Sequence, residues 1–278
     1  MIQLFKASNE NKLVVNEFDQ SSLIRTLNYI GGGAHGKVYK IYNMLDDQVY
    51  SLKKIDLIDE MSDISSDNTF SSLKDNTQLL LREIRVLAKL EHPNILRYNT
   101  SWLEFEKKRP ILCIQTKLYD YTLTDVMFND NLNKENIWKD IVNAIKYLHS
   151  KDIMHRDLKP DNIFTDSDMQ HAYVGDFGLA KYYENNDSRV MSDLYMGSEL
   201  YLAPECKSDT PIYTFESDIY SLGIIYLQLF SQCRSSMEFI SMFKSSFESF
   251  NVPDKIKLML SSEPSKRPKI TDIKIKID

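Results

Sequence analysis

The chain of 278 residues has little cysteine, little glycine and no long apolar run. Its three cysteines, Cys113, Cys206 and Cys233, lack metal-site spacing, so we expect free thiols in a reducing compartment. No stretch approaches the roughly 18 apolar residues of a membrane span, and the opening MIQLFKASNENK lacks the apolar core of a secretory signal. A net charge of −6 argues against a nucleic-acid partner. These absences predict no membrane partner and a cytoplasmic location, with the nucleus as an alternative.

Four of the eight glycines gather in YIGGGAHGKVY, at residues 29–39. They fit three phosphate-binding patterns: a dinucleotide fold, a P-loop and a kinase glycine loop. The first two open into a helix, and a P-loop also needs Ser or Thr where Val38 stands. Here the flanks, LIRTLNYI and VYKIY, both have the composition of strands. We therefore predict a hairpin whose glycine loop covers phosphates, and a glycine turn without a ligand is the alternative.

The rest of the first part of the chain is also strand-rich. VYSLKKI, ILRYNTSWLEF and PILCIQTKL have strand composition, and the Ser- and Asp-rich stretch at 56–76 predicts a loop. TQLLLREIRVLAKLEH predicts one helix among these strands. The apolar face of this helix would consist of Leu80, Ile84, Leu87 and Ala88.

The second part of the chain is predicted to be helical. Asn133 can cap a helix over KENIWKDIVNAIKYLHS. Its apolar stripe would consist of Ile137, Ile141, Ile145 and Leu148. ESDIYSLGIIYLQLF is apolar nearly all round, so we expect a buried helix. A strand-rich lobe followed by a helical lobe predicts an α+β fold with a ligand cleft between the lobes.

The strongest chemical signal is IMHRDLKPDNIF, at residues 153–164. Phosphoryl transfer requires that phosphates are held, metal ions bound and the nucleophile positioned. Asp157 can accept a proton from a substrate hydroxyl, and Lys159 can neutralise charge on the transferring phosphate. Asn162 offers a neutral oxygen to Mg²⁺, and Asp176, in VGDFGLAK, offers a hard carboxylate.

Two residues of the first part complete this set. Lys53, in the strand after the glycine loop, can reach the α- and β-phosphates of a nucleotide. Glu83, on the helix that follows, can pair with Lys53 and fix its side chain. Either residue alone would be interpreted as an ordinary surface charge.

These motifs occur in a fixed order, with APE at 203–205 closing the segment that begins at Asp176. From about residue 22 to about residue 270, the chain resembles a eukaryotic protein kinase catalytic domain. The resemblance implies a bilobal α+β fold, with a strand-rich N-lobe, a helical C-lobe and ATP in the cleft between them. The implied divisions are an N-terminal extension at 1–21 and a kinase domain at 22–278, with its N-lobe at about 22–116, hinge at 117–120 and C-lobe at 121–278.

The resemblance also implies transfer of the γ-phosphoryl group of ATP, with Mg²⁺, to a hydroxyl of a protein substrate. It implies that Asp157 is the catalytic base and that Asn162 and Asp176 are metal ligands. Thr116 aligns with the residue that guards the back of the nucleotide pocket. LKPDN favours the serine/threonine class, because tyrosine kinases usually lack a Lys two residues after the base. The residues expected around the nucleotide are Ile30, Gly31, Gly32, Gly33, Ala34, His35, Gly36, Lys37, Val38, Lys53, Glu83 and Thr116.

Three more residues match structural positions of the family. Asp218 matches the residue that braces the catalytic loop, and Glu205 and Arg267 match a buried ion pair. These matches imply that the helical lobe holds the catalytic loop from below.

HPNILRYNTSWLE, LCIQTKLYDYTLTDVM and SMEFISMFKSSFESFNVPD resemble the kinases of the α subunit of translation initiation factor 2. This narrower resemblance implies that subunit as the protein substrate, in stress or translation control. A Wee- or NEK-like cell-cycle kinase is an alternative, because the R-Y-x-x-x-W segment also occurs in Wee-type kinases. A pseudokinase that binds without turnover is a second alternative. A small-molecule phosphotransferase is a third, against which the APE segment argues. The sequence leaves the oligomeric state open.

Overall fold

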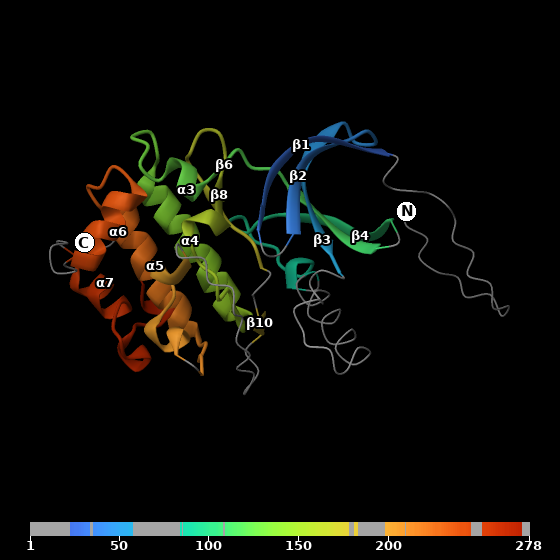
Figure 1. Cartoon of the computed structure of the whole chain (residues 1–278). Helices are drawn as coiled ribbons and strands as arrows, with labels where there is room; N and C mark the ends of the chain where they lie inside the picture. Colours follow the sequence, from blue (N-terminus) through green and yellow to red (C-terminus); the bar gives the residue numbers. More distant parts are fainter. Residues whose placement is uncertain are drawn as a thin grey trace.

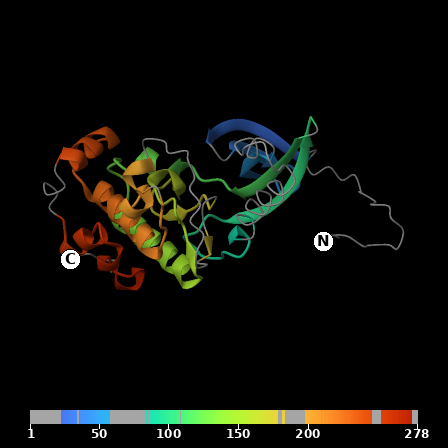
Figure 2. The ribbon, with the colours of Figure 1, turned by 60° about the horizontal axis from the view of Figure 1, so that its bottom comes forward.

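The computed structural model describes residues 23–33, 36–57, 84, 86–107, 109–177, 181–182, 198–208, 210–245 and 252–273. The strands β1 to β5 form one lobe and the helices α3 to α7 dominate another, and both views show the two lobes side by side (Figures 1 and 2). We refer to the part with β1 to β5 as the N-lobe and to the part from β6 onward as the C-lobe.

The N-lobe is built on a five-stranded antiparallel sheet with the strand order β1-β2-β3-β5-β4. Its strands are β1 (Ile24–Gly33), β2 (Gly36–Asn43), β3 (Gln48–Asp56), β4 (Tyr98–Glu106) and β5 (Arg109–Lys117). Each had been predicted as a strand from its β-branched and aromatic residues. β1 pairs with β2 up to Gly33 and Gly36, so the glycines lie at the end of a hairpin, as predicted.

Side chains alternate between the two faces of this sheet, as the pleat requires. On one face, Leu52 belongs to a small buried cluster that also includes Ile41 and Cys113. On the other face, Ile55 and Ile114 join the main core of the molecule. The face that carries Ile55 therefore connects the sheet to the C-lobe.

The predicted helix at 77–92 is described only around one turn, where the backbone N of Ala88 donates to the carbonyl O of Ile84 at 2.8 Å. Leu87 is buried as expected. The placement of Ala88 on the apolar face is wrong, because the helix gives way to a turn there and Ala88 is exposed. Leu80 and nearly all of the predicted loop at 56–76 lie outside the described residues.

The C-lobe consists mainly of helices, with short strands and 3₁₀ turns between them. Its helices are α3 (Leu123–Val126), α4 (Lys134–Ser150), α5 (Phe215–Phe230), α6 (Ser236–Ser245) and α7 (Asp254–Met259). Its strands are β6 (Tyr121–Thr122), β7 (Ile153–Met154), β8 (Ile163–Thr165), β9 (Ala172–Val174) and β10 (Lys181–Tyr182). Its 3₁₀ helices are η2 (Pro160–Asn162), η3 (Ser198–Leu200), η4 (Pro204–Lys207), η6 (Pro264–Lys266) and η7 (Ile270–Asp272).

The helix α4 begins where the sequence predicted. The side-chain oxygen of Asn133 accepts a hydrogen bond from the backbone N of Asn136 at 3.1 Å, which is the expected cap. The four predicted stripe residues of α4 are fully buried, and α5 is buried on nearly all sides, as predicted. Among the helices of the described ranges, none is both long enough and apolar enough to span a bilayer.

In the described part of the chain, the backbone connects the two lobes at two places. After β5 it passes through residues 118–120 into β6 of the C-lobe. Before β4, the segment 94–96 lies against β9: the backbone N of Val174 donates to the carbonyl O of Asn94 at 2.9 Å, and the backbone N of Leu96 donates to the carbonyl O of Val174 at 2.8 Å. The start of the N-lobe's β4 is therefore fixed to a C-lobe strand.

Candidate active site

The residues of the HRDLKPDN motif, 155–162, lie between β7 and β8 in a segment that ends with η2, which we call the catalytic loop. Lys159 Nζ lies 2.8 Å and 3.1 Å from the two carboxylate oxygens of Asp157. Asn162 Nδ2 donates to Asp157 Oδ2 and to the carbonyl O of Asp157, both at 2.8 Å. The Asp157 side chain keeps 24% of its surface exposed, so its carboxylate is both held in place and open to a substrate.

Asp218 on α5 supports the catalytic loop by accepting hydrogen bonds from its backbone. This carboxylate is 2% exposed and accepts hydrogen bonds from the backbone N of His155 at 3.0 Å and of Arg156 at 2.9 Å. Burial alone would raise the pKa of Asp218, but the contact with His149 and the backbone donors hold that pKa below its usual value. The predicted bracing by Asp218 is confirmed.

His149, near the end of α4, was not predicted as part of the site. Its Nε2 lies 2.9 Å from Asp218 Oδ2, and its ring packs on Phe215, with 4.7 Å between ring centroids. The signal in the sequence was weak, since a histidine near a helix end is more often a surface residue. Only the fold brings α4 and α5 together on either side of the catalytic loop.

The segment before Asp176 is tied to the same loop. The backbone N of Gly175 donates to the carbonyl O of Asn162 at 2.9 Å, and His155 Nε2 lies 3.0 Å from the carbonyl O of Gly175. Asp176 itself has a φ of 57°, in the left-handed region that Asp tolerates better than most residues. These contacts hold the segment that carries Asp176 against the loop that carries Asn162.

Lys53 reaches this site from the N-lobe. Its Nζ lies 3.1 Å from Asp176 Oδ1, and the two side chains are 19% and 36% exposed. This ion pair joins β3 of the N-lobe to the segment after β9 in the C-lobe. Glu83, the predicted partner of Lys53, lies outside the described residues.

Three of the residues predicted around the nucleotide lie on one face of the sheet. Val38 pairs with Lys53 across β2 and β3, and Thr116 pairs with Ser51 across β5 and β3. Because Ser51 and Lys53 are two residues apart on a strand, all four side chains share that face. The side chain of Lys37, the residue before Val38, projects from the opposite face of the sheet, so Lys37 could contact a nucleotide on the first face only through its backbone.

The glycines of the hairpin differ in their surroundings. A side chain at Gly31 would meet no atom within 4 Å, whereas one at Gly32 would meet the hydroxyl of Tyr29. Gly36 has a φ of +115°, and a β-carbon there would lie 2.5 Å from the carbonyl O of Lys54. Ile30, before these glycines, is exposed. The structure describes Gly33 only as the last residue of β1, and the predicted residues Ala34 and His35 lie outside the described ranges.

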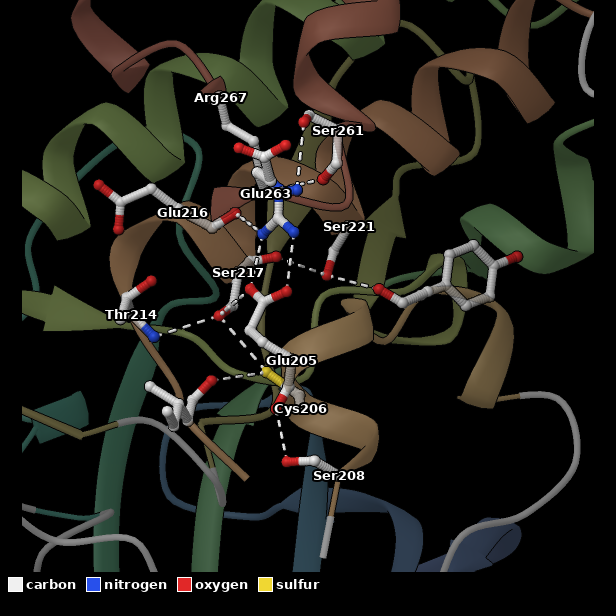
Figure 3. A network of polar contacts seen from close by, with 12 residues as sticks. Glu205, Cys206, Ser208, Thr214, Glu216, Ser217, Ser221, Ser261, Glu263 and Arg267 are labelled. Atoms are coloured by element: carbon white, nitrogen blue, oxygen red, sulfur yellow. Dashed lines mark hydrogen bonds and ion pairs between the residues drawn. The ribbon is translucent and has the colours of Figure 1, made fainter. Parts of the chain in front are cut away.

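A second polar network supports the segment that ends in APE (Figure 3). Arg267 donates to the two carboxylate oxygens of Glu205 at 2.6 Å and 2.7 Å, and Ser217 Oγ donates to the same carboxylate at 3.1 Å. Burial would raise the pKa of Glu205, but the hydrogen bonds from Arg267 lower it below its usual value. The predicted buried ion pair is confirmed, and it fixes η4 to α5.

Comparison with known families is consistent with this arrangement. The family model described as "Protein kinase domain" matches residues 24–275. The chain belongs to the protein kinase family. The match confirms the family that the motifs indicated and the bilobal α+β kinase fold. Membership of this family implies that ATP is the phosphoryl donor.

The chain is similar in sequence to several named protein kinases. The interferon-induced, double-stranded RNA-activated protein kinase of Rattus norvegicus is 31% identical over 274 residues, which cover 88% of this kinase and 49% of the relative. The Mus musculus protein of the same name is 31% identical over 272 residues, covering 88% and 48%. The eIF-2-alpha kinase GCN2 of Arabidopsis thaliana is 26% identical over 285 residues, covering 84% and 21%. The kinase spans about half the length of the first two relatives and about a fifth of the third.

Proposed function

We propose that the chain is a serine/threonine protein kinase in which Asp157 is the catalytic base and Asn162 and Asp176 bind Mg²⁺. The observation that carries this proposal is the position of the Asp157 carboxylate, fixed by Lys159 and by Asn162, whose carbonyl accepts a hydrogen bond from Gly175, the residue before Asp176. We assign this activity to a kinase domain at 22–278, with the hinge at 117–120 between the lobes.

In the proposed reaction, a substrate hydroxyl donates its proton to a carboxylate oxygen of Asp157. The hydroxyl oxygen then forms a bond to the γ-phosphorus of ATP, the bond from that phosphorus to the β-γ bridging oxygen breaks, and ADP leaves. Lys159 stabilises negative charge that develops on the transferring group. Because Lys159 already contacts Asp157, base and cation would act on the same phosphoryl group.

The donor set fits a divalent cation such as Mg²⁺. Asn162 uses its Nδ2 for Asp157, which leaves its Oδ1 free to coordinate a cation, and Asp176 supplies a carboxylate. No group of three His, Cys, Asp or Glu side chains suited to a metal occurs in the part of the chain that the structure describes. Two protein ligands completed by phosphate oxygens and water are the usual arrangement for Mg²⁺ in phosphoryl transfer. When bound, the ion would neutralise charge on the phosphates.

The N-lobe supplies the remaining contacts to ATP in this proposal. Lys53 would exchange part of its contact with Asp176 for the α- and β-phosphates. The backbone of residues 30–38 would cover the phosphates, since the open space beside Gly31 lets a ligand approach the main chain closely. Thr116, 9% exposed, would form the back wall of the adenine site.

For the substrate, we propose the α subunit of translation initiation factor 2, and hence an action in the cytoplasm. The sequence resemblance to the kinases of this subunit supports it, as does the name of the Arabidopsis relative. A Wee- or NEK-like cell-cycle kinase is the second candidate.

The test is a transfer assay with labelled ATP, Mg²⁺ and either the α subunit or a generic basic protein, in parallel with Asp157→Asn. We expect label on a serine of the α subunit, and its loss in the variant. Label on the generic protein alone would retain the kinase and reject the proposed substrate. Absence of label on every protein, including the chain itself, would favour a pseudokinase.

A further inference from the structure

Arg156, directly before the proposed base, occupies an unusual environment. Its φ of 70° lies in the left-handed region, which is uncommon for residues other than glycine. Its Nε is buried and has no hydrogen-bond partner among the residues that the structure describes. The guanidinium lies over the ring of Tyr213, with 4.1 Å between its central carbon and the ring centroid. A strained backbone and a buried cation both require support from their surroundings.

The ring of Tyr213 provides that support for the cation. Burial lowers the pKa of Arg156, whereas Tyr213 acts in the opposite direction and favours the charged form. Burial also raises the pKa of the Tyr213 hydroxyl, so the tyrosine is neutral at physiological pH. The guanidinium is therefore held by the aromatic face, an attraction that strengthens when the cation is desolvated, and by a hydrogen bond with the Tyr213 hydroxyl.

Tyr213 is itself held on both sides by the network of Figure 3. The backbone N of Ile212 donates to the carbonyl O of Glu205 at 3.3 Å, and Cys206 Sγ donates to the carbonyl O of Ile212 at 3.1 Å. On the other side, the backbone N of Thr214 donates to Ser217 Oγ at 3.1 Å. The residues on either side of Tyr213 are thus tied to the segment that carries the Glu205–Arg267 ion pair.

We propose that Tyr213 is a positioning residue that acts through Arg156 to hold Asp157 in its reactive place. This inference rests on the proposed function, because it concerns the residue assigned as base. Two contacts fix Arg156: Asp218 holds its backbone N–H, and Tyr213 holds its side chain. Of these two contacts, a variant without Tyr213 keeps only the backbone one, and the strained backbone of Arg156 can relax together with the neighbouring Asp157.

The test compares Tyr213→Leu, Tyr213→Phe and Arg156→Leu, alone and in combination. We expect Tyr213→Leu to lower kcat on the order of tenfold, with KM for ATP unchanged because the ATP contacts are distant. Tyr213→Phe should lose less turnover than Tyr213→Leu, since the ring remains and only the hydrogen bond to Arg156 is lost. The double variant Tyr213→Leu/Arg156→Leu should be no slower than Arg156→Leu.

Tyr226→Leu is the matched control, because Tyr226 is a half-buried tyrosine of the same lobe that packs on Trp138, away from the catalytic loop. It should lower the melting temperature without changing kcat. Wild-type kcat in Tyr213→Leu, or additive losses in the double variant, would overturn the inference. If the wild-type chain transfers no phosphate, the proposed function fails instead.

In that case the free energy of unfolding in urea is measured for wild type, Tyr213→Leu, Arg156→Leu and the double variant. Zero coupling between Arg156 and Tyr213 in this double-mutant cycle would overturn the inference.

Discussion

The glycine hairpin of the N-lobe and the catalytic loop of the C-lobe are held in different ways. Around Gly31, the hairpin depends on backbone pairing between β1 and β2, and the space beside the glycine is open. The catalytic loop is fixed by side chains on several elements, with Asp218 below it and Asn162 across it. A loop that opens to admit and release a nucleotide must be able to move, whereas the carboxylate that accepts a proton must be placed to within a fraction of an ångström. Substitutions in the two regions should therefore have different consequences.

The largest effect is expected at the proposed base. Asp157→Asn should lower kcat by roughly 10²–10⁴-fold, the range for loss of a positioned base, and should leave the melting temperature nearly unchanged. Initial rates and thermal unfolding measure the two quantities. Asp152→Asn, at an exposed residue just before the loop, is the control and should retain wild-type kcat. Wild-type turnover in Asp157→Asn would remove this residue from the mechanism.

Asp218→Asn should break the support of the catalytic loop. An amide cannot replace the carboxylate for all three of its donors, so we expect the free energy of unfolding to fall by about 3 kcal/mol at pH 7. kcat should fall as well, because the backbone before Asp157 loses its acceptor. Urea unfolding at pH 7 measures the first quantity, and a wild-type midpoint would contradict the role given to Asp218.

The same variant has a pH signature. The pKa of Asp218 is lower in the folded chain than its value of 3.8 in the unfolded chain. Its contribution to stability is therefore present above that value and is lost as the pH falls through the folded pKa. The difference in unfolding free energy between wild type and Asp218→Asn should narrow when urea titrations are moved from pH 7 to below pH 3.8. A constant difference would show that the lost stability comes from packing rather than from charge.

In the hairpin, Gly36→Ala and Gly31→Ala should behave differently. At Gly36, the φ of +115° and the carbonyl of Lys54 leave no place for a β-carbon, so we expect a loss of about 1–3 kcal/mol in unfolding free energy. Gly31→Ala should leave stability nearly unchanged and act on KM for ATP, because its open side faces no protein atom. Equal stability losses in urea unfolding would contradict this difference between the two glycines.

The smallest effect is expected at the proposed back wall. Thr116→Met should weaken the binding of bulky ATP-site inhibitors on the order of tenfold, since the longer side chain overfills the space behind the nucleotide. Inhibition curves for a bulky and a compact inhibitor, at fixed ATP relative to KM, measure this selectivity. Unchanged sensitivity to the bulky compound would place Thr116 outside that wall.

Local patterns in the sequence predicted much of the fold. The cap at Asn133 and the stripe of α4 depend on neighbours a few residues away, and both are present as expected. The hairpin around the glycines was predictable for the same reason. Ala88 was assigned to the apolar face because the pattern continues past the point where the helix ends.

Contacts between residues far apart in the sequence could be predicted only in part. Motifs identified Lys53 and Asp176, but their 3.1 Å contact spans 123 positions of the chain. No periodicity indicates that Tyr213 lies under Arg156, because that contact depends on how the loop before α5 is anchored. The left-handed backbone of Arg156 was equally hidden, since arginine has no preference for it. The predicted partner Glu83 stays a prediction.

The attachment of the segment 94–96 to β9 limits how the two lobes can move relative to each other. A body connected to another at a single point can swing in any direction. In the described part of the chain, two backbone connections join the lobes: the passage from β5 to β6 and the hydrogen bonds between the segment 94–96 and Val174. Rotation about the line through these two connections stretches neither of them, whereas the Lys53–Asp176 ion pair and the shared apolar core resist it. The Lys53–Asp176 distance is then a direct coordinate for that rotation.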